Sequence, residues 1–262
     1  MNIINSKNNI QIKEIKKLRN RKYRNQKDKF LVEGFRFFEE AVKSEFIVPT
    51  IFVNEILQDK WEEFIKDKNL EDLIKGKIYY VSNKLFETIS GTDNSQGVIA
   101  VVKNRKLEVK SQNGFYVLTD RIQDPGNMGT IIRSAHASGA LGVILTKGTV
   151  DIYNEKTLRS TMGSIFHIPI IYDYNLENIK SLKKDGFKIL ASTLDTDVDF
   201  YKCKLADRII IAVGNEGNGL SEDIINMSDI NVKIPMPGSA ESLNVSVAAS
   251  IMMFEIVRRR LK

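Results

Sequence analysis

The first hundred residues alternate between short apolar runs and helical patterns. Runs rich in Val, Ile and aromatic residues predict strands at residues 30–34, 48–53, 77–82 and 96–102. Between them, Phe35, Phe38 and Val42 recur at helical spacing, and residues 61–75 carry a similar amphipathic stripe. Residues 104–113 are polar and charged, which is typical of an exposed connection. The pattern predicts an α/β domain at 1–103 and a linker at 104–113.

The second half has a different pattern, in which the apolar runs are continuous. They lie at residues 114–120, 142–146, 187–193 and 207–213. Continuous runs indicate strands covered on both faces, as in a parallel sheet flanked by helices. We expect a helix from Met128 to Ser138 and a final helix that begins near Asn244. Its inward stripe is Val245, Ala248, Ala249, Met252, Met253 and Ile256. The fold class is therefore α/β, with a second domain at 114–262.

Composition excludes several classes of protein. There is one cysteine, Cys203, and there are two histidines, so we expect neither a disulfide framework nor a metal site. No apolar run is long enough to span a bilayer, and the N-terminus lacks the order of a secretory signal. These features indicate a soluble protein of a reducing compartment, which favours the cytoplasm.

Charge is concentrated at the N-terminus. The chain carries a net charge of +6, yet ten cations and only two acidic residues precede Phe30. The cations are Lys7, Lys13, Lys16, Lys17, Arg19, Arg21, Lys22, Arg24, Lys27 and Lys29. A basic arm on a near-neutral body is typical of a segment that follows phosphates. A solvated helix face would show the same composition, so charge alone leaves both interpretations open.

Three segments of the second half carry candidate chemistry. The first follows the apolar run at 114–120, where residues 124–127 form a turn before a helix that we expect to start at Asn127. A capped helix start after a strand presents free N–H groups. Arg133 follows in the same helix. An ordinary strand-turn-helix connection would have the same pattern.

The second segment is the loop at 214–219, which contains Gly214, Gly217 and Gly219 directly after an apolar strand. Such glycines indicate left-handed backbone or close approach of a ligand. The loop lacks the Gly-Lys-Ser/Thr ending of a phosphate loop and the GxGxxG spacing of dinucleotide-binding proteins. Glu216 would oppose a pyrophosphate, so a cationic or hydroxyl-bearing ligand fits better.

The third segment spans residues 232–250. Pro235 and Pro237 exclude a central strand there. Four polar residues then precede or open the final helix, and capping explains only one of them. They are Ser239, Glu241, Ser242 and Asn244. A concave site built from loops at the carboxyl ends of strands explains the set better.

Together and in this order, the three segments resemble the SpoU (TrmH-type) branch of the SPOUT methyltransferases. The resemblance covers NMGTIIRSAHASGA, VGNEGNGLS and IPMPGSAESLNVSVAASI, and residues 17–42 with 95–102 resemble that branch's substrate-binding module. It implies a knotted α/β domain with a deep trefoil knot, and a smaller N-terminal domain similar to a ribosomal protein. It also implies a homodimer, S-adenosylmethionine as cofactor, and RNA 2′-O-ribose methylation.

The resemblance also assigns site residues. Asn127, Arg133, Glu216, Ser242 and Asn244 would line the catalytic pocket. The cofactor would be held by Ser192, Thr193, Gly214, Asn215, Gly219, Ile234, Met236 and Leu243. Because guanidinium has a pKa above about 12, we expect Arg133 to stabilise the developing alkoxide or to hold a phosphate rather than to act as a base.

Other functions remain as alternatives. A separate substrate module favours large-subunit (23S) ribosomal RNA, and a transfer RNA methyltransferase of the same family is the alternative. A non-catalytic RNA-binding protein would be expected to lose the motif positions, which are all present here. A nucleotide-dependent oxidoreductase would need the glycine fingerprint that the chain lacks.

Overall fold

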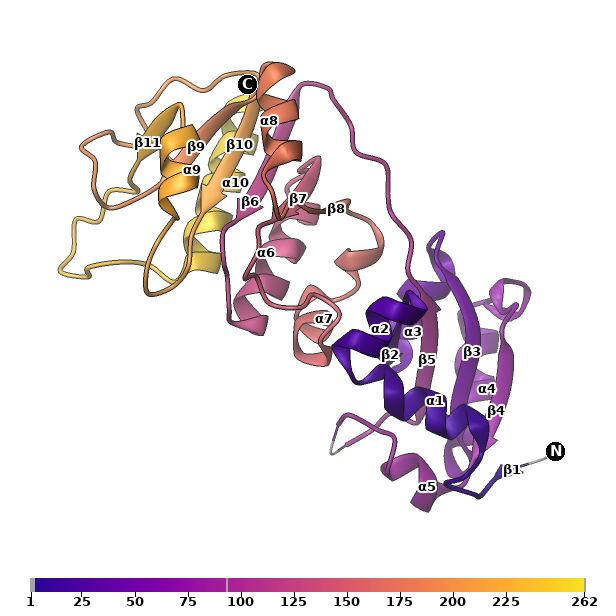
Figure 1. Ribbon diagram of the computed structural model, residues 1–262. Coiled ribbons are helices and arrows are strands. Elements are labelled where there is room, and N and C mark those ends of the chain that lie inside the picture. Colours follow the sequence, from indigo (N-terminus) through magenta and orange to yellow (C-terminus); the bar gives the residue numbers. More distant parts are fainter. Residues whose placement is uncertain (1–2, 93, 262) are drawn as a thin grey trace. The chain divides into compact units, whose positions relative to one another are not determined.

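The computed structural model describes residues 3–92 and 94–261, and these fall into two compact units. The first unit contains the residues up to Arg105 together with Tyr153–Phe166, and the second contains Lys106–Ile152 and the residues from His167 onward. The second half of the chain thus contributes one segment to the first unit. Figure 1 labels the elements along the chain.

The first unit is built on a mixed sheet with strand order β1-β4-β3-β5-β2. Its strands are β1 Ile3–Ile4, β2 Lys29–Glu33, β3 Ile47–Asn54, β4 Lys77–Val81 and β5 Val98–Lys103. Its helices are α1 Ile10–Leu18, α2 Arg21–Lys27, α3 Phe35–Lys43, α4 Gln58–Asp67, α5 Asn83–Glu87 and α7 Glu155–Thr161, with short turns η1 Glu55–Leu57, η2 Glu71–Leu73 and η3 Ser164–Phe166. The strands β2, β3, β4 and β5 occupy the four predicted apolar runs.

The second unit is a six-stranded parallel sheet with order β11-β9-β10-β6-β7-β8. Its strands are β6 Gly114–Thr119, β7 Gly142–Leu145, β8 Ile170–Tyr172, β9 Lys188–Ser192, β10 Arg208–Val213 and β11 Ile230–Val232. Its helices are α6 Pro125–Ala137, α8 Glu177–Lys184, α9 Glu222–Met227 and α10 Val245–Arg260. The prediction of a parallel sheet is confirmed.

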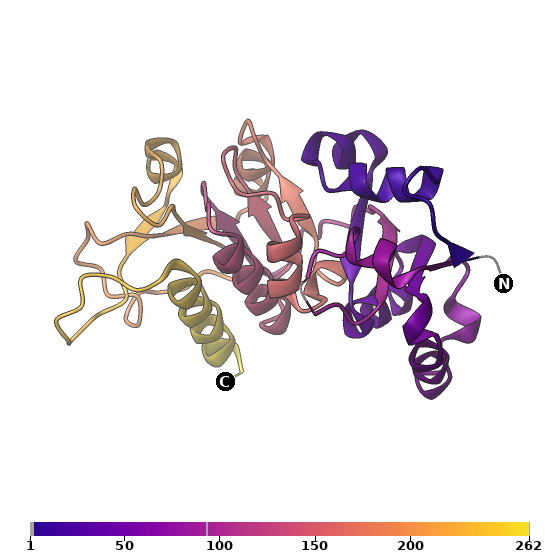
Figure 2. The same ribbon diagram turned by 90° about the horizontal axis from the view of Figure 1, so that it is seen from below.

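Helices cover both faces of this sheet. Ile179 and Leu182 of α8 and Ile224 of α9 pack into one apolar cluster with Tyr116, Ile210 and other sheet residues. The helices α6 and α10 contact each other and the opposite face, as Figures 1 and 2 show. Covering both faces explains why the strand sequences are continuously apolar.

The topology has a switch point between β6 and β10. From β6 the chain proceeds through β7 and β8 on one side, and it then returns to β9, β10 and β11 on the other side. The connections that follow β6 and β10 therefore diverge at the carboxyl edge of two neighbouring strands. Ligand sites of open parallel sheets lie at such switch points.

Two local predictions need correction. The helix α6 begins at Pro125 rather than at Asn127, because Asp124 is the N-cap and its carboxylate accepts from the backbone N–H of Asn127 at 2.8 Å. A proline at the first helical position is favourable because it has no N–H to leave unpaired. The side chain of Asn127 is consequently not used for capping.

The basic segment is folded rather than an extended arm. It forms β1, α1 and α2, and Ile12, Ile15 and Leu18 of α1 are buried in the core of the first unit. The guanidinium of Arg24 is buried and donates to the carbonyls of Leu18 at 2.9 Å and Arg19 at 2.6 Å, which closes the end of α1. Most cations remain exposed, namely Lys7, Lys13, Lys16, Lys17, Arg19, Arg21, Lys22 and Lys27.

The segment Tyr153–Phe166 is integrated into the first unit through aromatic contacts. The ring of Phe30 stacks on Tyr153 with centroids 4.6 Å apart, and Phe166 packs against Phe46 at 5.2 Å. The hydroxyl of Tyr153 donates to Asn104 at 2.6 Å. None of the described helices combines the length and apolar character needed to cross a bilayer.

Candidate active site

A cavity of about 620 Å³ opens at the carboxyl ends of β9 and β10 in the second unit. All eight cofactor-binding candidates from the sequence line it, together with three of the five catalytic candidates. They are Ser192, Thr193, Gly214, Asn215, Gly219, Ile234, Met236 and Leu243, and Glu216, Ser242 and Asn244. Segments more than fifty residues apart in the sequence therefore form one wall.

The loop that follows β10 is held by its own backbone and by Asn215. The N–H of Asn215 donates to the carbonyl of Gly219 at 2.8 Å, and the reverse bond is 2.9 Å. The side-chain oxygen of Asn215 accepts from Gly217 and Asn218, each at 3.0 Å, and its amide donates to the carbonyl of Arg121 at 3.0 Å. These contacts fix the shape of the loop and tie it to the end of β6. The Asn215 side chain is thus occupied by contacts within the loop and with Arg121.

Two glycines of this loop are required for different reasons. A Cβ atom on Gly214 would collide with the backbone of Gly219 and Leu220. Gly219 has φ +65°, in the left-handed region, and open space around it. Position 214 requires glycine because neighbouring backbone lies too close for a side chain, and position 219 favours glycine because its backbone is left-handed.

A chain of hydrogen bonds joins the three sequence segments. The amide of Asn244 donates to the side-chain oxygen of Asn127 at 2.9 Å, and the amide of Asn127 donates to Glu216 at 3.0 Å. The side-chain oxygen of Asn244 in turn caps α10 by accepting from the N–H and hydroxyl of Ser246 at 2.9 and 2.7 Å. Each amide donates in the same direction, so the chain ends on the Glu216 carboxylate. Asn127 does not line the cavity itself but connects two residues that do.

The Glu216 carboxylate has a lowered pKa. Partial desolvation raises the pKa, but hydrogen bonds from the Asn127 amide, the loop backbone and the N–H groups of Gln123 and Asp124 outweigh it. The last two bonds are 3.4 Å long. Glu216 is consequently ionised at neutral pH and acts as a hydrogen-bond acceptor.

Arg133 lies apart from these residues. It is exposed on α6 and does not line the cavity, and its guanidinium has no hydrogen bond or ion pair to any residue that the structure describes. The structure therefore brings together four of the five catalytic candidates and leaves Arg133 outside.

The cavity also has walls that the sequence analysis missed. Leu194 and Asp195 continue the loop after β9, Leu220 follows the glycine loop, and Val245 and Ala248 belong to the first turns of α10. Their position directly after a strand or a motif could have indicated them. Asp120 is buried at 1% exposure and joins neighbouring loops, because it accepts from Thr146 at 2.7 Å and from the N–H of Ser221 at 2.6 Å.

The charged side chains described in the wall of the cavity are acidic. Among the described residues, its lining includes two carboxylates, Asp195 and Glu216, and no lysine or arginine. Apolar side chains line the remainder, among them Leu220, Ile234 and Leu243. This composition favours a ligand with an apolar part and a cationic part, and it disfavours a polyphosphate. In the described ranges 3–92 and 94–261, no group of three or more His, Cys, Asp or Glu side chains could hold a metal ion.

Comparison with known proteins identifies two regions of the chain. Residues 114–254 match the model of the SpoU rRNA Methylase family, and residues 9–100 match an MRM3-like substrate binding domain. The chain is 35% identical over 256 residues to the 23S rRNA (guanosine(2553)-2′-O)-methyltransferase RlmP of Bacillus subtilis (strain 168), which covers 98% of this chain and 99% of that protein.

Solved structures agree over the full length. An AdoMet-bound rRNA methyltransferase from Sinorhizobium meliloti has a TM-score of 0.85 at 30% identity and covers 100% of this chain and 98% of its own. The SpoU methyltransferase AviRb from Streptomyces viridochromogenes, in complex with AdoMet, has a TM-score of 0.87 at 28% identity, covering 97% and 99%. With a family match over more than half of its residues and a relative aligned along nearly its whole length, this chain belongs to the SpoU rRNA methylase family.

Proposed function

We propose that this protein is an S-adenosylmethionine-dependent RNA 2′-O-ribose methyltransferase that acts on large-subunit (23S) ribosomal RNA in the cytoplasm. The observation that carries the proposal is the chain of bonds from Asn244 through Asn127 to Glu216 at the rim of a cavity. Full-length similarity to RlmP, a 23S rRNA 2′-O-methyltransferase, supports the substrate.

The cavity fits the cofactor by size and chemistry. Its volume of about 620 Å³ lies in the range of small-molecule sites. Apolar Ile234, Met236 and Leu243 can enclose an adenine, while Glu216 and Asp195 suit a cationic sulfonium and ammonium. The bound cofactor supplies an electrophilic methyl group. The chain's own residues then have to place a ribose hydroxyl in line with it and orient that hydroxyl for the loss of its proton.

We assign these tasks to the side chains at the rim. The ionised Glu216 accepts a hydrogen bond from the ribose 2′-hydroxyl, and Asn127 fixes the orientation of that carboxylate. Ser242 and Asn244 border the cavity where the ribose must enter. The lowered pKa makes Glu216 a weak base, so its contribution is orientation of the hydroxyl, with the proton passing on to solvent.

Arg133 requires a second copy of the chain. It is exposed and outside its own cavity, and we propose that a homodimer places it at the partner's cavity, where it stabilises the developing alkoxide. The surface of α10 supports dimerisation, because Val247, Phe254 and Leu261 remain 46%, 49% and 82% exposed along one side of a helix that also buries its opposite face. Exposed apolar stripes of this kind mark interfaces.

Subunit mixing tests this arrangement. Arg133→Ala keeps its cavity, and a second variant with the cavity blocked, Gly214→Val, keeps its arginine. Equal mixing after dissociation should restore about a quarter of wild-type activity, because half of the dimers would be mixed and each would hold one complete site. If neither the variants nor their mixture show activity, Arg133 does not act across an interface. Near-normal turnover by Arg133→Ala alone would remove it from the mechanism.

We also propose that residues 233–244 thread a loop to form a trefoil knot. The support is the position of Asn244, which bonds to Asn127 while the same segment shares a cavity with the loops after β9 and β10. An experimental backbone that straightens when both ends are pulled apart would contradict the knot.

The function itself is tested in cells and with purified protein. Mapping 2′-O-methylated positions in total RNA with and without this protein should reveal one site missing from 23S rRNA. Loss of a site in transfer RNA would redirect the substrate assignment. Calorimetry should detect binding of S-adenosylhomocysteine, and a lack of binding together with unchanged RNA would refute the proposal.

A further inference from the structure

The first unit contains a second cavity, of about 350 Å³, between α3, α7 and the loop that precedes β5. Its described lining is Glu33, Gly34, Arg36, Phe37, Thr92, Asn94, Gln96, Arg159 and Met162. We propose that this cavity binds one unpaired nucleotide of the RNA substrate. This inference rests on the proposed function, because it assigns a recognition site to the same RNA.

The cavity presents two guanidinium groups. Arg36 and Arg159 are both exposed, and neither guanidinium forms a hydrogen bond or ion pair with any residue in the described part of the chain. The carboxylate in the wall is already engaged, because Glu33 accepts from Ser90, from the N–H of Gly91, and from two further hydroxyls at 2.6 to 2.9 Å. The two guanidinium groups outnumber this one carboxylate, so the formal charge of the described wall is positive. Guanidinium groups bind phosphate oxygens in bidentate geometry.

The remaining walls suit a base. Phe37 is half-buried and its ring packs on Phe166 with centroids 5.5 Å apart, so it offers a fixed apolar surface. Met162 is 41% exposed and has φ 51°, in the left-handed region that methionine rarely adopts. Aromatic and apolar surfaces of this kind stack on unpaired bases.

The amide of Gln96 can read the edge of that base. Its oxygen accepts from the backbone N–H of Phe35 at 2.8 Å, at the start of α3, so its NH₂ group is left as a donor of fixed orientation. Gly34 makes this possible, because it has φ +98° and a Cβ there would lie 2.9 Å from the Gln96 oxygen. Asn94 adds a second amide on the same loop. Cations, an apolar surface and oriented amides together favour a nucleotide over free phosphate.

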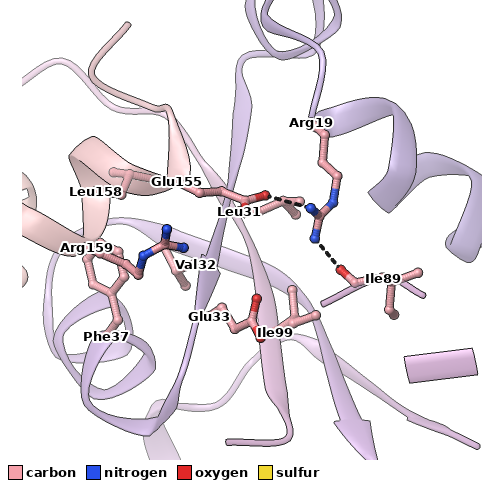
Figure 3. Close-up of a pocket in the computed structure, with 10 residues that line it drawn as sticks. All are labelled: Arg19, Leu31, Val32, Glu33, Phe37, Ile89, Ile99, Glu155, Leu158 and Arg159. Atoms are coloured by element: carbon pink, nitrogen blue, oxygen red, sulfur yellow. Dashed lines mark hydrogen bonds and ion pairs between the residues drawn. The ribbon is translucent and has the colours of Figure 1, made fainter. Parts of the chain in front are cut away.

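Arg159 is placed by a helix that is well anchored in the first unit. Figure 3 shows α7 against β2, where Glu155 pairs with Arg19 at 3.3 Å and Arg19 also donates to the carbonyl of Ile89 at 2.6 Å. Leu158, next to Arg159, is 1% exposed. The helix α7, anchored by its buried side, thus directs Arg159 toward the α3 side, where it lines the same cavity as Phe37.

The test measures RNA binding by the full chain. A fluorescein-labelled single-stranded RNA of mixed sequence and its perfectly paired duplex serve as probes. Arg36→Gln and Arg159→Gln should each weaken binding of the single strand by about fivefold to tenfold, because each removes charged hydrogen bonds to phosphate. Lys75→Gln, which removes an equally exposed positive charge of the first unit, should change it less than twofold. Duplex affinity should fall no more for the arginine variants than for this control.

Two further measurements separate this inference from the proposed function. RNA carrying 4-thiouridine should crosslink to Phe37 or Met162 of the wild-type protein, which does not depend on any variant folding. S-adenosylhomocysteine binding should be unchanged in both arginine variants. If the arginine variants bind the single strand as tightly as Lys75→Gln does, the nucleotide pocket is overturned even if methyl transfer is normal. Crosslinks found only at residues other than Phe37 and Met162 would overturn it as well. If binding of the single strand requires both arginines but the protein shows no methyl transfer, the proposed function is refuted and the nucleotide pocket is retained.

Discussion

Gly214 offers the sharpest test of the active-site geometry. A Cβ atom at this position would lie well inside contact distance of the Gly219 and Leu220 backbone. Ordinary contacts of a Cβ atom begin near 3.4 Å, so in Gly214→Ala the loop of residues 214–220 has to move by about 1 Å. The atoms that this Cβ would meet belong to the backbone, so rotation of a neighbouring side chain cannot relieve the clash.

The displacement should be visible in cofactor affinity. A hydrogen bond from the loop that lengthens by 1 Å is lost, and each lost bond costs about 1 kcal/mol. Two such bonds correspond to roughly a tenfold to thirtyfold weaker Kd for S-adenosylhomocysteine. Isothermal titration calorimetry measures this directly, with circular dichroism to establish that the variant is folded.

Two neighbouring glycines provide matched controls. Gly219→Ala has free space but a φ of +65°, so it should cost about 1 kcal/mol of backbone strain and an intermediate loss of affinity. Gly217→Ala places a Cβ 3.7 Å from the Asn215 oxygen, an ordinary contact, and should bind normally. If all three variants are folded and bind equally well, the loop does not hold the cofactor and the assignment of the cavity is wrong.

Three other predictions concern charge. Asn127→Ala removes a hydrogen-bond donor that helps to lower the pKa of Glu216. The pKa of this carboxylate, followed by ¹³C NMR, should therefore be higher in the variant. An unchanged titration would show that this bond is not formed in solution. Glu255→Gln should lower the free energy of unfolding in urea by about 1 kcal/mol at pH 7, because buried Glu255 accepts from Arg258 and Arg259. These bonds lower the pKa of Glu255 from 4.5 to about 2. The difference in unfolding free energy between wild type and variant should therefore persist above pH 4.5 and vanish as the pH falls toward 2. A difference that stays constant with pH would contradict this. Replacing Lys13, Lys16 and Lys17 by Gln should reduce the slope of log Kd for single-stranded RNA against log salt by about 2, and an unchanged slope would show that the exposed face of α1 does not contact RNA.

The fold was predictable where one physical requirement dominates. Burial on both faces dictates the continuous apolar runs of β6, β7, β9 and β10, and these strands formed as expected. The predicted cap of α6 lies three residues too late, because both Asp124 and Asn127 are good capping residues and sequence alone does not say which one caps. For the basic segment, composition leaves an arm and a solvated helix face both open, because its three buried apolar residues lie among many more lysines and arginines.

The site was predictable in its location but not in its connections. The carboxyl ends of neighbouring parallel strands meet at one edge, so the loops after β9 and β10 had to lie together. The direction of the bonds from Asn244 to Asn127 to Glu216 depends on side-chain orientation, which no pattern encodes. The cavity that contains Arg36 and Arg159 could not be foreseen, because these residues lie 123 positions apart and belong to regions of different pattern.

The contribution of Tyr153–Phe166 to the first unit has a practical consequence for dissecting this protein. A fragment that stops at Arg105 would lack the aromatic partners of Phe30 and Phe46 and the acid that neutralises Arg19. Such a fragment should expose apolar surface and aggregate, even though the break lies in a polar stretch. Exchanging substrate modules between relatives would therefore require two grafts rather than one, with the short segment transplanted alongside the N-terminal half.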